Sequence, residues 1–187
     1  LARAAGVDAE AVASGLRTYS PGAHRIVTVA EADGVTWVDD SKATNPHSAE
    51  AALTSLPQGT GVWICGGDTK GAQFFDLVRT VRPHLRGAVV IGKDQSDILA
   101  ALEQEAPGLP VTRISHAAPE QVSAAAVEAA GTMARSGDTV MLAPACASWD
   151  QFTSYAQRGD LFAAAAKAYA GGGTPETTDA SGVQEKL

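Results

Sequence analysis

The chain has 187 residues, of which 45% are hydrophobic and only 5% aromatic, and its formal net charge is −7. This length predicts one domain with its ends, or at most two small domains, around a core made mainly of Ala, Val, Leu and Ile. The acidic balance argues against a general nucleic-acid-binding or anionic-membrane-binding surface, because both kinds of surface need a basic patch.

The sequence contains no sign of a membrane span or a signal peptide. No apolar run reaches the ~18 residues of a span, and the first residues lack the apolar core of a signal peptide. Cys65 and Cys146 are too few for a disulfide framework or a zinc site, so we expect reduced thiols near a core. We therefore expect a cytoplasmic protein. Because the chain begins with Leu1 and not Met, we expect it to be cut from a longer one.

The first elements along the chain are a helix and a hairpin. An Ala-rich stretch with helical apolar register covers residues 1–17, and the Tyr-Ser-Pro-Gly run at residues 19–22 ends it. Two β-prone runs follow at residues 25–29 and 35–38. Asp33-Gly34 lies between them and is typical of a hairpin turn.

Helices and strands alternate along the rest of the chain. Asn45 is a suitable N-cap for a helix that begins at Pro46. The pattern predicts strands at residues 61–65, 88–92, 111–114 and 138–143, and helices at residues 46–56, 75–81, 96–105, 119–135 and 150–170. Such alternation favours a mostly parallel sheet covered on both faces, to which the hairpin adds an antiparallel pair. We therefore predict a three-layer α/β/α Rossmann-like domain with a mixed, mostly parallel six-stranded sheet.

The last residues differ from the rest in composition. Residues 171–187 are rich in Gly, Thr and Ser and contain few large apolar side chains. Such a segment cannot bury enough apolar surface to offset the entropy lost on ordering. We predict a disordered tail.

Polar or Gly-rich residues follow three of the predicted strands, namely Asp39–Asn45, Gly66–Gly71 and Pro144–Asp150. The carboxyl ends of parallel strands lie along one edge of a sheet, where ligands of open α/β proteins bind. These segments are therefore expected to form one site.

The side chains expected at this edge favour an anionic ligand. Lys42 and Lys70 supply cations. Hydroxyl groups come from Ser41, Thr44, Thr69 and Ser148. Helix N-termini expected after Asn45 and Ser148 would add backbone N–H groups. Each charge-assisted hydrogen bond contributes about 1.5–3 kcal/mol, so two or three of them would hold a small dicarboxylate.

Taken singly, each of these features has a simpler interpretation. Gly66-Gly67-Asp68 is compatible with an ordinary turn, Lys42 with a solvated surface lysine and Ser148 with a helix cap. The favoured interpretation depends on three such segments sharing one edge. The histidines show no metal-ligand spacing, so we expect each to lie on the surface or in a loop; they are His24, His47, His84 and His116.

Several nucleotide and hydrolase signatures are absent from the sequence. It contains no phosphate-cradling P-loop, no G-x-G-x-x-G after a strand, no G-x-S-x-G elbow and no H-E-x-x-H pair. A nucleotide would therefore have to be shared with another domain.

The motifs together resemble the C-terminal domain of the Mur ligases, in particular of the members that add D-glutamate. The resemblance covers about residues 16–170. It rests on Asp-Ser-Lys-Ala-Thr-Asn at 40–45, Gly-Gly-Asp-Thr-Lys at 66–70 and Pro-Ala-Cys-Ala-Ser-Trp-Asp-Gln-Phe at 144–152. Ser-Ala-Glu-Ala-Ala-Leu at 48–53, His24-Arg25 and Gln157-Arg158-Gly159 also fit.

The resemblance implies an ATP-dependent amide ligase of peptidoglycan synthesis. It would join D-glutamate to UDP-N-acetylmuramoyl-L-alanine through an acyl phosphate. ATP and Mg²⁺ would be bound mainly by a central ATPase domain, with this domain supplying D-glutamate and closing over the nucleotide. Closure would exclude the water that hydrolyses an acyl phosphate.

The resemblance also implies a role for individual residues. Lys42 would be catalytic, close to the transferred phosphate and the reacting carboxyl. Four residues would bind D-glutamate: Thr44, Lys70, Ser148 and Tyr155. Tyr155 stands where the family often has Phe, and Thr69 where it commonly has a small residue. Arg25, Asp40 and Lys42 would reach the nucleotide, and no residue here would be a metal ligand.

The domain boundaries follow from the same resemblance. Residues 1–17 would end the preceding ATPase domain, residues 18–170 would form the amino-acid-binding domain, and residues 171–187 have no counterpart. We expect a monomer that is inactive as a ligase without the P-loop domain. Two alternatives stay open: a free-standing Rossmann-like module that binds an amino acid or nucleotide, and a ligase of the same family that adds another amino acid.

Overall fold

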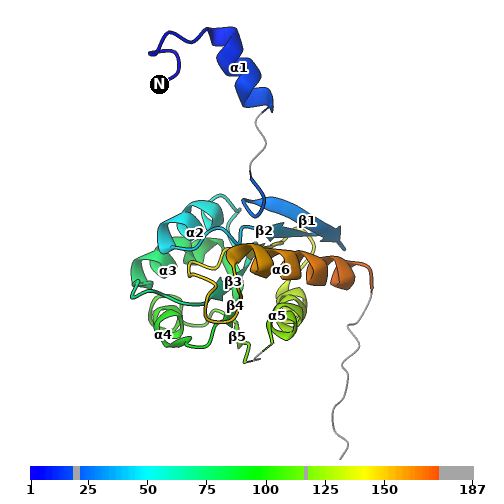
Figure 1. Cartoon of the computed structure of the whole chain (residues 1–187). Coiled ribbons are helices and arrows are strands. Elements are labelled where there is room, and N and C mark those ends of the chain that lie inside the picture. The colour runs from blue at the N-terminus through cyan, green and yellow to red at the C-terminus, as the bar shows by residue number, and fades with distance from the viewer. Residues whose placement is uncertain (19–21, 116–117, 173–187) are drawn as a thin grey trace, which may run out of the picture.

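A single six-stranded sheet forms the centre of the molecule, seen in the computed structural model in Figure 1. The structure describes residues 1–18, 22–115 and 118–172. In sequence order the strands are β1 (Val27–Ala32), β2 (Val35–Asp39), β3 (Gly61–Gly66), β4 (Leu85–Ile91), β5 (Val111–Arg113) and β6 (Thr139–Leu142). Across the sheet they are ordered β1-β2-β6-β3-β4-β5. Among these six strands β1 and β2 form the one antiparallel pair, so the predicted mixed, mostly parallel sheet is confirmed.

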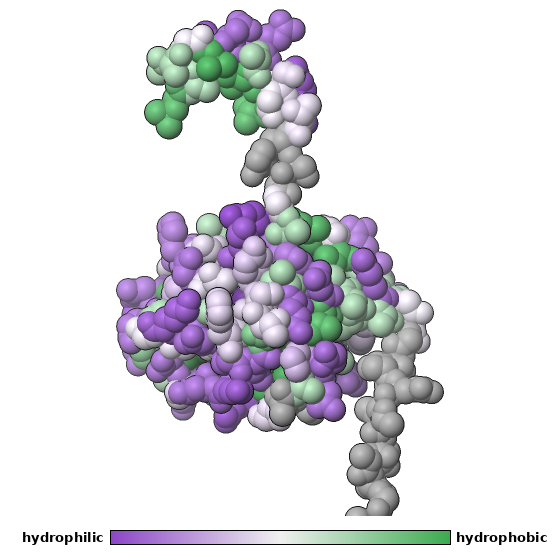
Figure 2. Space-filling view, in the orientation of Figure 1, coloured by the Kyte–Doolittle hydropathy of each residue, from purple (hydrophilic) through white to green (hydrophobic). Residues whose placement is uncertain are grey.

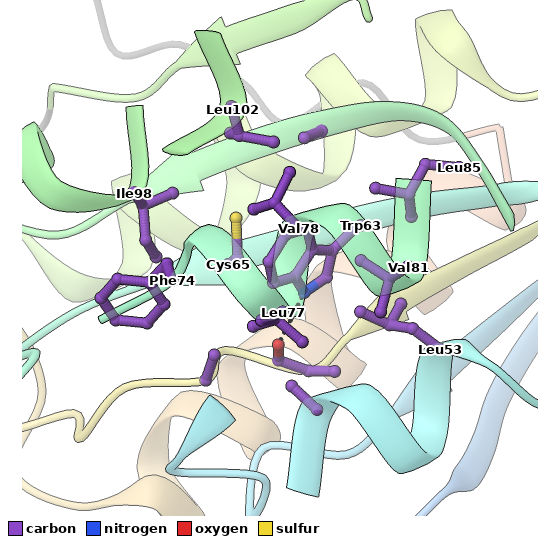
Figure 3. Packing of buried hydrophobic residues seen from close by; sticks show 14 of the residues in the cluster. Leu53, Trp63, Cys65, Phe74, Leu77, Val78, Val81, Leu85, Ile98 and Leu102 are labelled. Atoms are coloured by element: carbon purple, nitrogen blue, oxygen red, sulfur yellow. Dashed lines mark hydrogen bonds between the residues drawn. The ribbon is translucent and has the colours of Figure 1, made fainter. Parts of the chain in front are cut away.

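Helices cover both faces of this sheet. One face carries α2 (Pro46–Leu53), α3 (Phe75–Val81) and α4 (Ser96–Glu105), and the other carries α5 (Pro119–Met133) and α6 (Tyr155–Ala170). A short 3-10 helix, Arg82–His84, joins α3 to β4. Figure 3 shows the core on the face covered by α2, α3 and α4, where Trp63 of β3 lies next to Val78 and Val81 of α3. Its indole N–H donates to the Ala143 carbonyl at 2.7 Å. The predicted three-layer architecture is therefore confirmed.

The start of α2 agrees with the sequence pattern. The Asn45 side chain accepts a hydrogen bond from the backbone N–H of Ser48 at 2.9 Å, and Pro46 occupies the first turn. An amide oxygen at the N-cap satisfies a backbone donor that the helix itself cannot. The predicted cap is confirmed.

The predicted start of the last helix at Asp150 is wrong. Helix α6 begins at Tyr155, and the hydroxyl of Ser154 caps it by accepting from Gln157 N at 3.0 Å. The residues before it bond to another loop. The Asp150 carboxylate accepts a hydrogen bond from the backbone N–H of Lys93 at 2.9 Å, and the Gln151 amide oxygen accepts one from the backbone N–H of Gly92 at 2.7 Å. These contacts tie the segment to the loop after β4, so it cannot continue the helix. A helix N-terminus directly after Ser148 is excluded.

The N-terminal stretch takes no part in the core. Helix α1 (Ala9–Thr18) contains no buried residue, and it begins later than predicted because residues 2–6 form turns. Leu1, Val7 and Leu16 are exposed, and Figure 2 shows apolar surface gathered on this N-terminal stretch. The predicted tail, residues 171–187, lies outside the described residues except for Gly171 and Gly172, and so does His116.

Two further expectations concern the cysteines and the membrane. Cys65 and Cys146 are both free and buried, and burial raises the pKa of Cys65 and raises that of Cys146 to about 12. Both are therefore thiols near a core, as predicted. Within the part of the chain that the structure describes, every helix is too short or too polar to serve as a membrane span.

Candidate functional site

Three loops meet at the carboxyl edge of the sheet, because β2, β6 and β3 are neighbours in it. We call them the β2 loop (residues 40–45), the β3 loop (residues 67–74) and the β6 loop (residues 143–154). The Ala145 N–H donates to the Ala43 carbonyl at 2.9 Å and joins the β6 loop to the β2 loop. Asp68 and Ala147 exchange backbone hydrogen bonds of 3.0 and 2.9 Å and join the β3 loop to the β6 loop. The three predicted segments therefore lie together at one edge of the sheet, as expected, and are joined by backbone hydrogen bonds.

Glycine is required where the β3 loop crosses the β6 loop. A Cβ at Gly67 would lie 2.3 Å from the carbonyl oxygen of Ala147, and the φ of Gly67 is +129°. Both the backbone conformation and the close approach exclude other residues here. Gly66 ends β3, Gly67 forms a bend and Asp68 forms a β-bridge with Ala147, so this stretch is not an ordinary turn but fastens two loops together.

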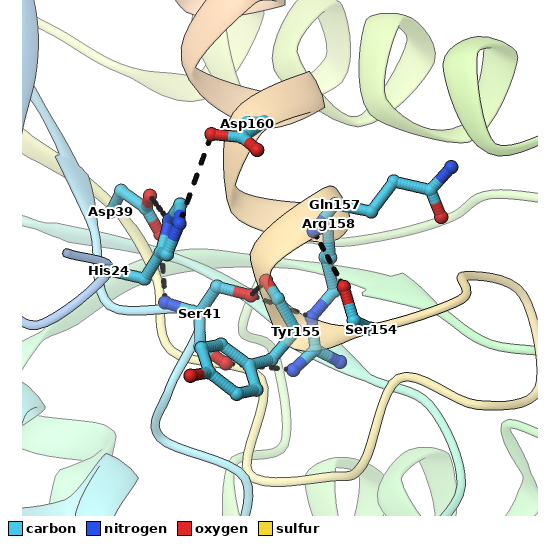
Figure 4. A network of polar contacts seen from close by, with 8 residues as sticks. All are labelled: His24, Asp39, Ser41, Ser154, Tyr155, Gln157, Arg158 and Asp160. Atoms are coloured by element: carbon cyan, nitrogen blue, oxygen red, sulfur yellow. Dashed lines mark hydrogen bonds and ion pairs between the residues drawn. The ribbon is translucent and has the colours of Figure 1, made fainter.

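A buried arginine lies beneath the site (Figure 4). The Arg158 guanidinium on α6 donates to the hydroxyl of Ser41 at 3.0 Å, to the Ser41 carbonyl at 2.9 Å and to the Cys146 carbonyl at 3.2 Å. Ser41 in turn donates its hydroxyl to the carbonyl of Tyr155 at 2.7 Å. Burial lowers the pKa of Arg158 to about 10, which leaves it charged at neutral pH. The arginine thereby holds the β2 and β6 loops on α6.

His24 lies in the turn before β1, within the predicted choice of surface or loop, and belongs to the same network. Its side chain is only 12% exposed, and its Nδ1 lies 2.7 Å from a carboxylate oxygen of Asp39. Its ring meets the Tyr155 ring edge-on, and its carbonyl accepts from Lys42 N at 3.1 Å. A Cβ at Gly159 would lie 2.2 Å from His24 Nδ1, so the missing side chain of Gly159 makes room for the imidazole. His24 therefore joins the segment before β1 to the β2 loop and α6.

The predicted nucleotide-binding residues come together around an open pocket of about 610 Å³. Arg25, Asp40 and Lys42 line it, together with Ser48 and Ala51 of α2. Burial raises the pKa of Asp40 to about 6, and the adjacent Asp39 also raises it, whereas a backbone hydrogen bond from Ile26 and the charge of Arg25 lower it. The pocket therefore combines two cations with a carboxyl group that titrates near neutral pH.

The predicted catalytic lysine lies between this pocket and Tyr155. The Lys42 ammonium lies over the Tyr155 ring, 5.2 Å from its centroid, a distance suited to a cation–π contact. Lys42 and Thr44 are half-buried, and Tyr155 is 36% exposed. The interpretation of Lys42 as a freely solvated lysine is therefore wrong.

Ser148 lies in the β6 loop and Lys70 in the β3 loop. Ser148 is 1% exposed, and its hydroxyl has no hydrogen-bond partner among the described residues. A buried hydroxyl without a partner is costly, which is typical of a group that a ligand satisfies. Lys70 is exposed. Its backbone has a left-handed conformation with a φ of +50°, and its N–H donates to the Asp68 carboxylate at 3.0 Å. Thr69 lies 3.5 Å from the Asp97 carboxylate and is directed toward α4.

The sequence offered signals for two residues that were not assigned to the site. Arg158 lies four and eight residues before the buried Phe162 and Ala166, so a charged group occupies the apolar stripe of a helix. Asp39 ends an otherwise apolar strand that is buried at four of five positions. Within residues 1–18, 22–115 and 118–172, no group of three or more His, Cys, Asp or Glu side chains could hold a metal ion.

Comparison with known proteins gives a consistent result. The family model described as "Mur ligase, glutamate ligase domain" matches residues 24–146. UDP-N-acetylmuramoylalanine–D-glutamate ligase from Bifidobacterium longum subsp. infantis is 49% identical over 168 residues, which are 88% of this chain and 35% of that enzyme. The enzyme of the same name from Frankia casuarinae is 53% identical over 171 residues, 91% of this chain and 35% of the relative. The chain thus spans about 35% of the length of the curated relatives it matches.

Solved structures resemble this chain at the level of the fold. MurC from Thermotoga maritima aligns with a TM-score of 0.56 at 12% identity, over 90% of this chain and 35% of that one. MurF from Acinetobacter baumannii aligns with a TM-score of 0.55 at 16% identity, over 89% of this chain and 35% of that one. At such low identity the similarity supports the architecture and says nothing about the substrate.

Proposed function

Because the chain belongs to the Mur ligase family, as its glutamate ligase domain, we propose that it is the amino-acid-binding part of an enzyme that joins D-glutamate to UDP-N-acetylmuramoyl-L-alanine. The observation that carries this proposal is the joining of the three loops, which brings together Lys42, Thr44, Lys70 and the buried Ser148. Relatives about half identical to this chain bear the name of that enzyme.

The proposed chemistry needs an activated carboxyl group, since a carboxylate resists attack by an amine. Transfer of the γ-phosphoryl group of ATP to the carboxylate of UDP-N-acetylmuramoyl-L-alanine gives an acyl phosphate and ADP. The amine of D-glutamate then attacks the acyl carbon, the amide bond forms, phosphate leaves and the amine loses a proton. A bound Mg²⁺ would neutralise charge on the phosphates, and we place it, with most of the ATP contacts, in another part of the enzyme.

The residues of this chain would bind and orient the reactants. Lys42 would sit beside the transferred phosphoryl group, where a cation stabilises charge that develops in the transition state. Its contact with Tyr155 fixes the direction of its ammonium group. Arg25 and Asp40 line the same pocket and would contact the nucleotide, Arg25 at the base or phosphates and Asp40 at the ribose.

The opposite half of the site would hold D-glutamate. Ser148 presents a buried hydroxyl that has no partner within the described chain, and Lys70 presents an exposed ammonium group. A hydroxyl and a cation suit the carboxylates of D-glutamate, and Thr44 and the Tyr155 ring would complete the contacts. We further propose that the apolar side of residues 1–17 packs against the preceding ATPase domain.

The test is the Michaelis constant for D-glutamate in the full-length ligase carrying Lys70→Ala. Loss of a charge-assisted hydrogen bond of about 1.5–3 kcal/mol should raise this constant roughly 10- to 100-fold, with a smaller effect on the constant for ATP. Lys93→Ala is the matched control, because Lys93 is an exposed lysine at the end of the next strand, β4. An unchanged constant for D-glutamate would refute the role of Lys70. Assays with L-alanine and meso-diaminopimelate in place of D-glutamate test the specificity.

A further inference from the structure

The backbone at Ile26 is strained. Its φ is +49°, and a β-branched residue is a genuine outlier in this left-handed region. In the part of the chain that the structure describes, four other residues besides glycines have a positive φ. Asp33 lies in the hairpin turn, where Asp adopts this conformation readily, whereas His24, Lys70 and Ala145 belong to the segments around the candidate site. Backbone strain that gathers in this way points to function.

A buried carboxylate accounts for the conformation of Ile26 but not for its side chain. The backbone N–H of Ile26 donates a hydrogen bond to the carboxylate of Asp40, which is 7% exposed and therefore needs a donor. That hydrogen bond requires the backbone alone. Glycine at position 26 would supply the same N–H and would adopt a positive φ without strain. The isoleucine side chain therefore has another reason to be there.

Packing in the core is not that reason. Ile26 is 59% exposed, and among the described residues it belongs to neither hydrophobic core and packs against neither. It lines the open pocket of about 610 Å³ instead, together with the exposed Ala51 of α2. More than half of its surface is thus accessible to a ligand in the pocket that Arg25, Asp40 and Lys42 also line.

We propose that Ile26 contacts the base of ATP and sets the affinity of the ligase for this nucleotide. The assignment depends on the proposed function, in which Lys42 lies at the transferred phosphoryl group and Asp40 at the ribose. Phosphates, ribose and base follow one another in ATP, and the hydrogen bond from Ile26 to Asp40 makes these two residues neighbours in the same order. A base next to the ribose therefore lies on the Ile26 side chain, as apolar groups line most ligand sites. Arg25 is left for the phosphates.

Ile26→Ala in the full-length ligase tests this contact. The Michaelis constant for ATP should rise roughly five- to twentyfold, because most of the apolar contact with the base is lost, and the constant for D-glutamate should change by less than about twofold. Ile26→Leu keeps an apolar side chain and should stay within about threefold for ATP. Val27→Ala is the matched control. Val27 is the neighbouring β-branched residue and is 37% exposed, but it does not line the pocket, so both constants should stay unchanged.

Two inhibitors that compete with ATP locate the contact on the nucleotide. ADP carries the base, and inorganic tripolyphosphate does not. Ile26→Ala should weaken inhibition by ADP as much as it raises the constant for ATP, and it should leave inhibition by tripolyphosphate unchanged. Equal weakening of both inhibitors would overturn the contact with the base, because the substitution would then act through the phosphates or through the fold.

Ile26→Gly separates binding from stability. Since glycine relieves the strain at φ +49°, the free energy of unfolding should stay about the same or rise, whereas Val27→Gly, in the extended strand β1, should lower it. The Michaelis constant for ATP should still rise in Ile26→Gly as it does in Ile26→Ala. An unchanged constant for ATP in these two variants overturns the proposal, whatever their stability. If the unaltered full-length ligase forms no D-glutamyl product, the proposed function fails instead.

Discussion

At the scale of single residues, the site contains groups that are costly for the folded protein. Asp40 is buried next to Asp39, and Ser148 holds a hydroxyl without a partner among the described residues. Both lie in loops that the rest of the structure holds firmly through Arg158 and the backbone pairs. Such destabilising groups are retained where ligand binding requires them. Substitutions at these two residues should therefore affect the stability of the fold and the binding of ligand in different ways.

Asp40 should make the stability of the domain depend on pH. Its pKa in the folded state, about 6, is above the ordinary 3.8, so the folded chain binds a proton that the unfolded chain does not. Stability should therefore fall as pH rises from 3.8 to about 6, and then stay level. Asp40→Asn should be more stable than the unaltered chain above this range, by about 1–2 kcal/mol, and equally stable below it.

Urea denaturation of both proteins at pH 4 and pH 8 measures this difference. The Asn side chain can still accept the hydrogen bond from Ile26, so the pair isolates the charge. If the two proteins differ in stability by the same amount at both pH values, the raised pKa of Asp40 in the folded state is contradicted.

The two serines of the β6 loop should respond differently to loss of the hydroxyl. Ser148→Ala removes a buried hydroxyl that bonds to nothing in the described structure, so the free energy of unfolding should stay the same or rise. Ser154→Ala removes the cap of α6 and should cost about 1 kcal/mol. In the full-length ligase only Ser148→Ala should raise the Michaelis constant for D-glutamate, by roughly tenfold. If Ser148→Ala proves the more destabilising variant, Ser148 is structural.

At the scale of elements, the geometry of the site depends on how the loops after β2, β3 and β6 are joined. The order of the strands places these loops side by side, and backbone hydrogen bonds between the loops fix their positions relative to one another. Helix α6 then fixes the arrangement from below, because Arg158 bonds to the β2 and β6 loops at once. A change at one crossing point should therefore displace residues on two loops.

Gly67→Ala tests the crossing of the β3 and β6 loops. The added Cβ would meet the Ala147 carbonyl at 2.3 Å and should break the Asp68–Ala147 pair, with a loss of about 2–4 kcal/mol in the free energy of unfolding. Gly71→Ala is the control in the same loop. Gly71 also has a positive φ, +77°, but a Cβ there meets nothing within 4 Å, so only backbone strain of about 1 kcal/mol is expected. Equal losses in thermal or chemical denaturation would show that contact with Ala147 is unimportant.

At the scale of the whole molecule, the function proposed above makes this chain one side of a site that a second domain would complete. The pocket lined by Arg25, Asp40 and Lys42 is open, and the sequence contains no P-loop for ATP phosphates. An acyl phosphate formed on such an open surface would be exposed to water. The proposed ligase activity therefore requires closure against an ATP-binding domain.

The 187-residue chain by itself should not catalyse amide formation. Incubation with UDP-N-acetylmuramoyl-L-alanine, D-glutamate, ATP and Mg²⁺ should yield neither ADP nor the D-glutamyl product above the background, and the full-length ligase under the same conditions is the positive control. Product formed by the chain alone would contradict both the division of the site and the assignment of ATP to another domain.

The sequence by itself determined the architecture and the chemistry of the loops. The alternating strands and helices, the Asn45 cap and the three polar strand ends all follow from local periodicity and turn composition, which act over a few residues. The tertiary structure alone decided what meets across the fold. His24 on Asp39, Arg158 beneath Ser41 and the late start of α6 depend on contacts between distant segments. Local sequence marks Arg158 and Asp39 as charged groups at buried positions but does not give their partners, because hydrogen-bond partners are set only when the strands are ordered in the sheet.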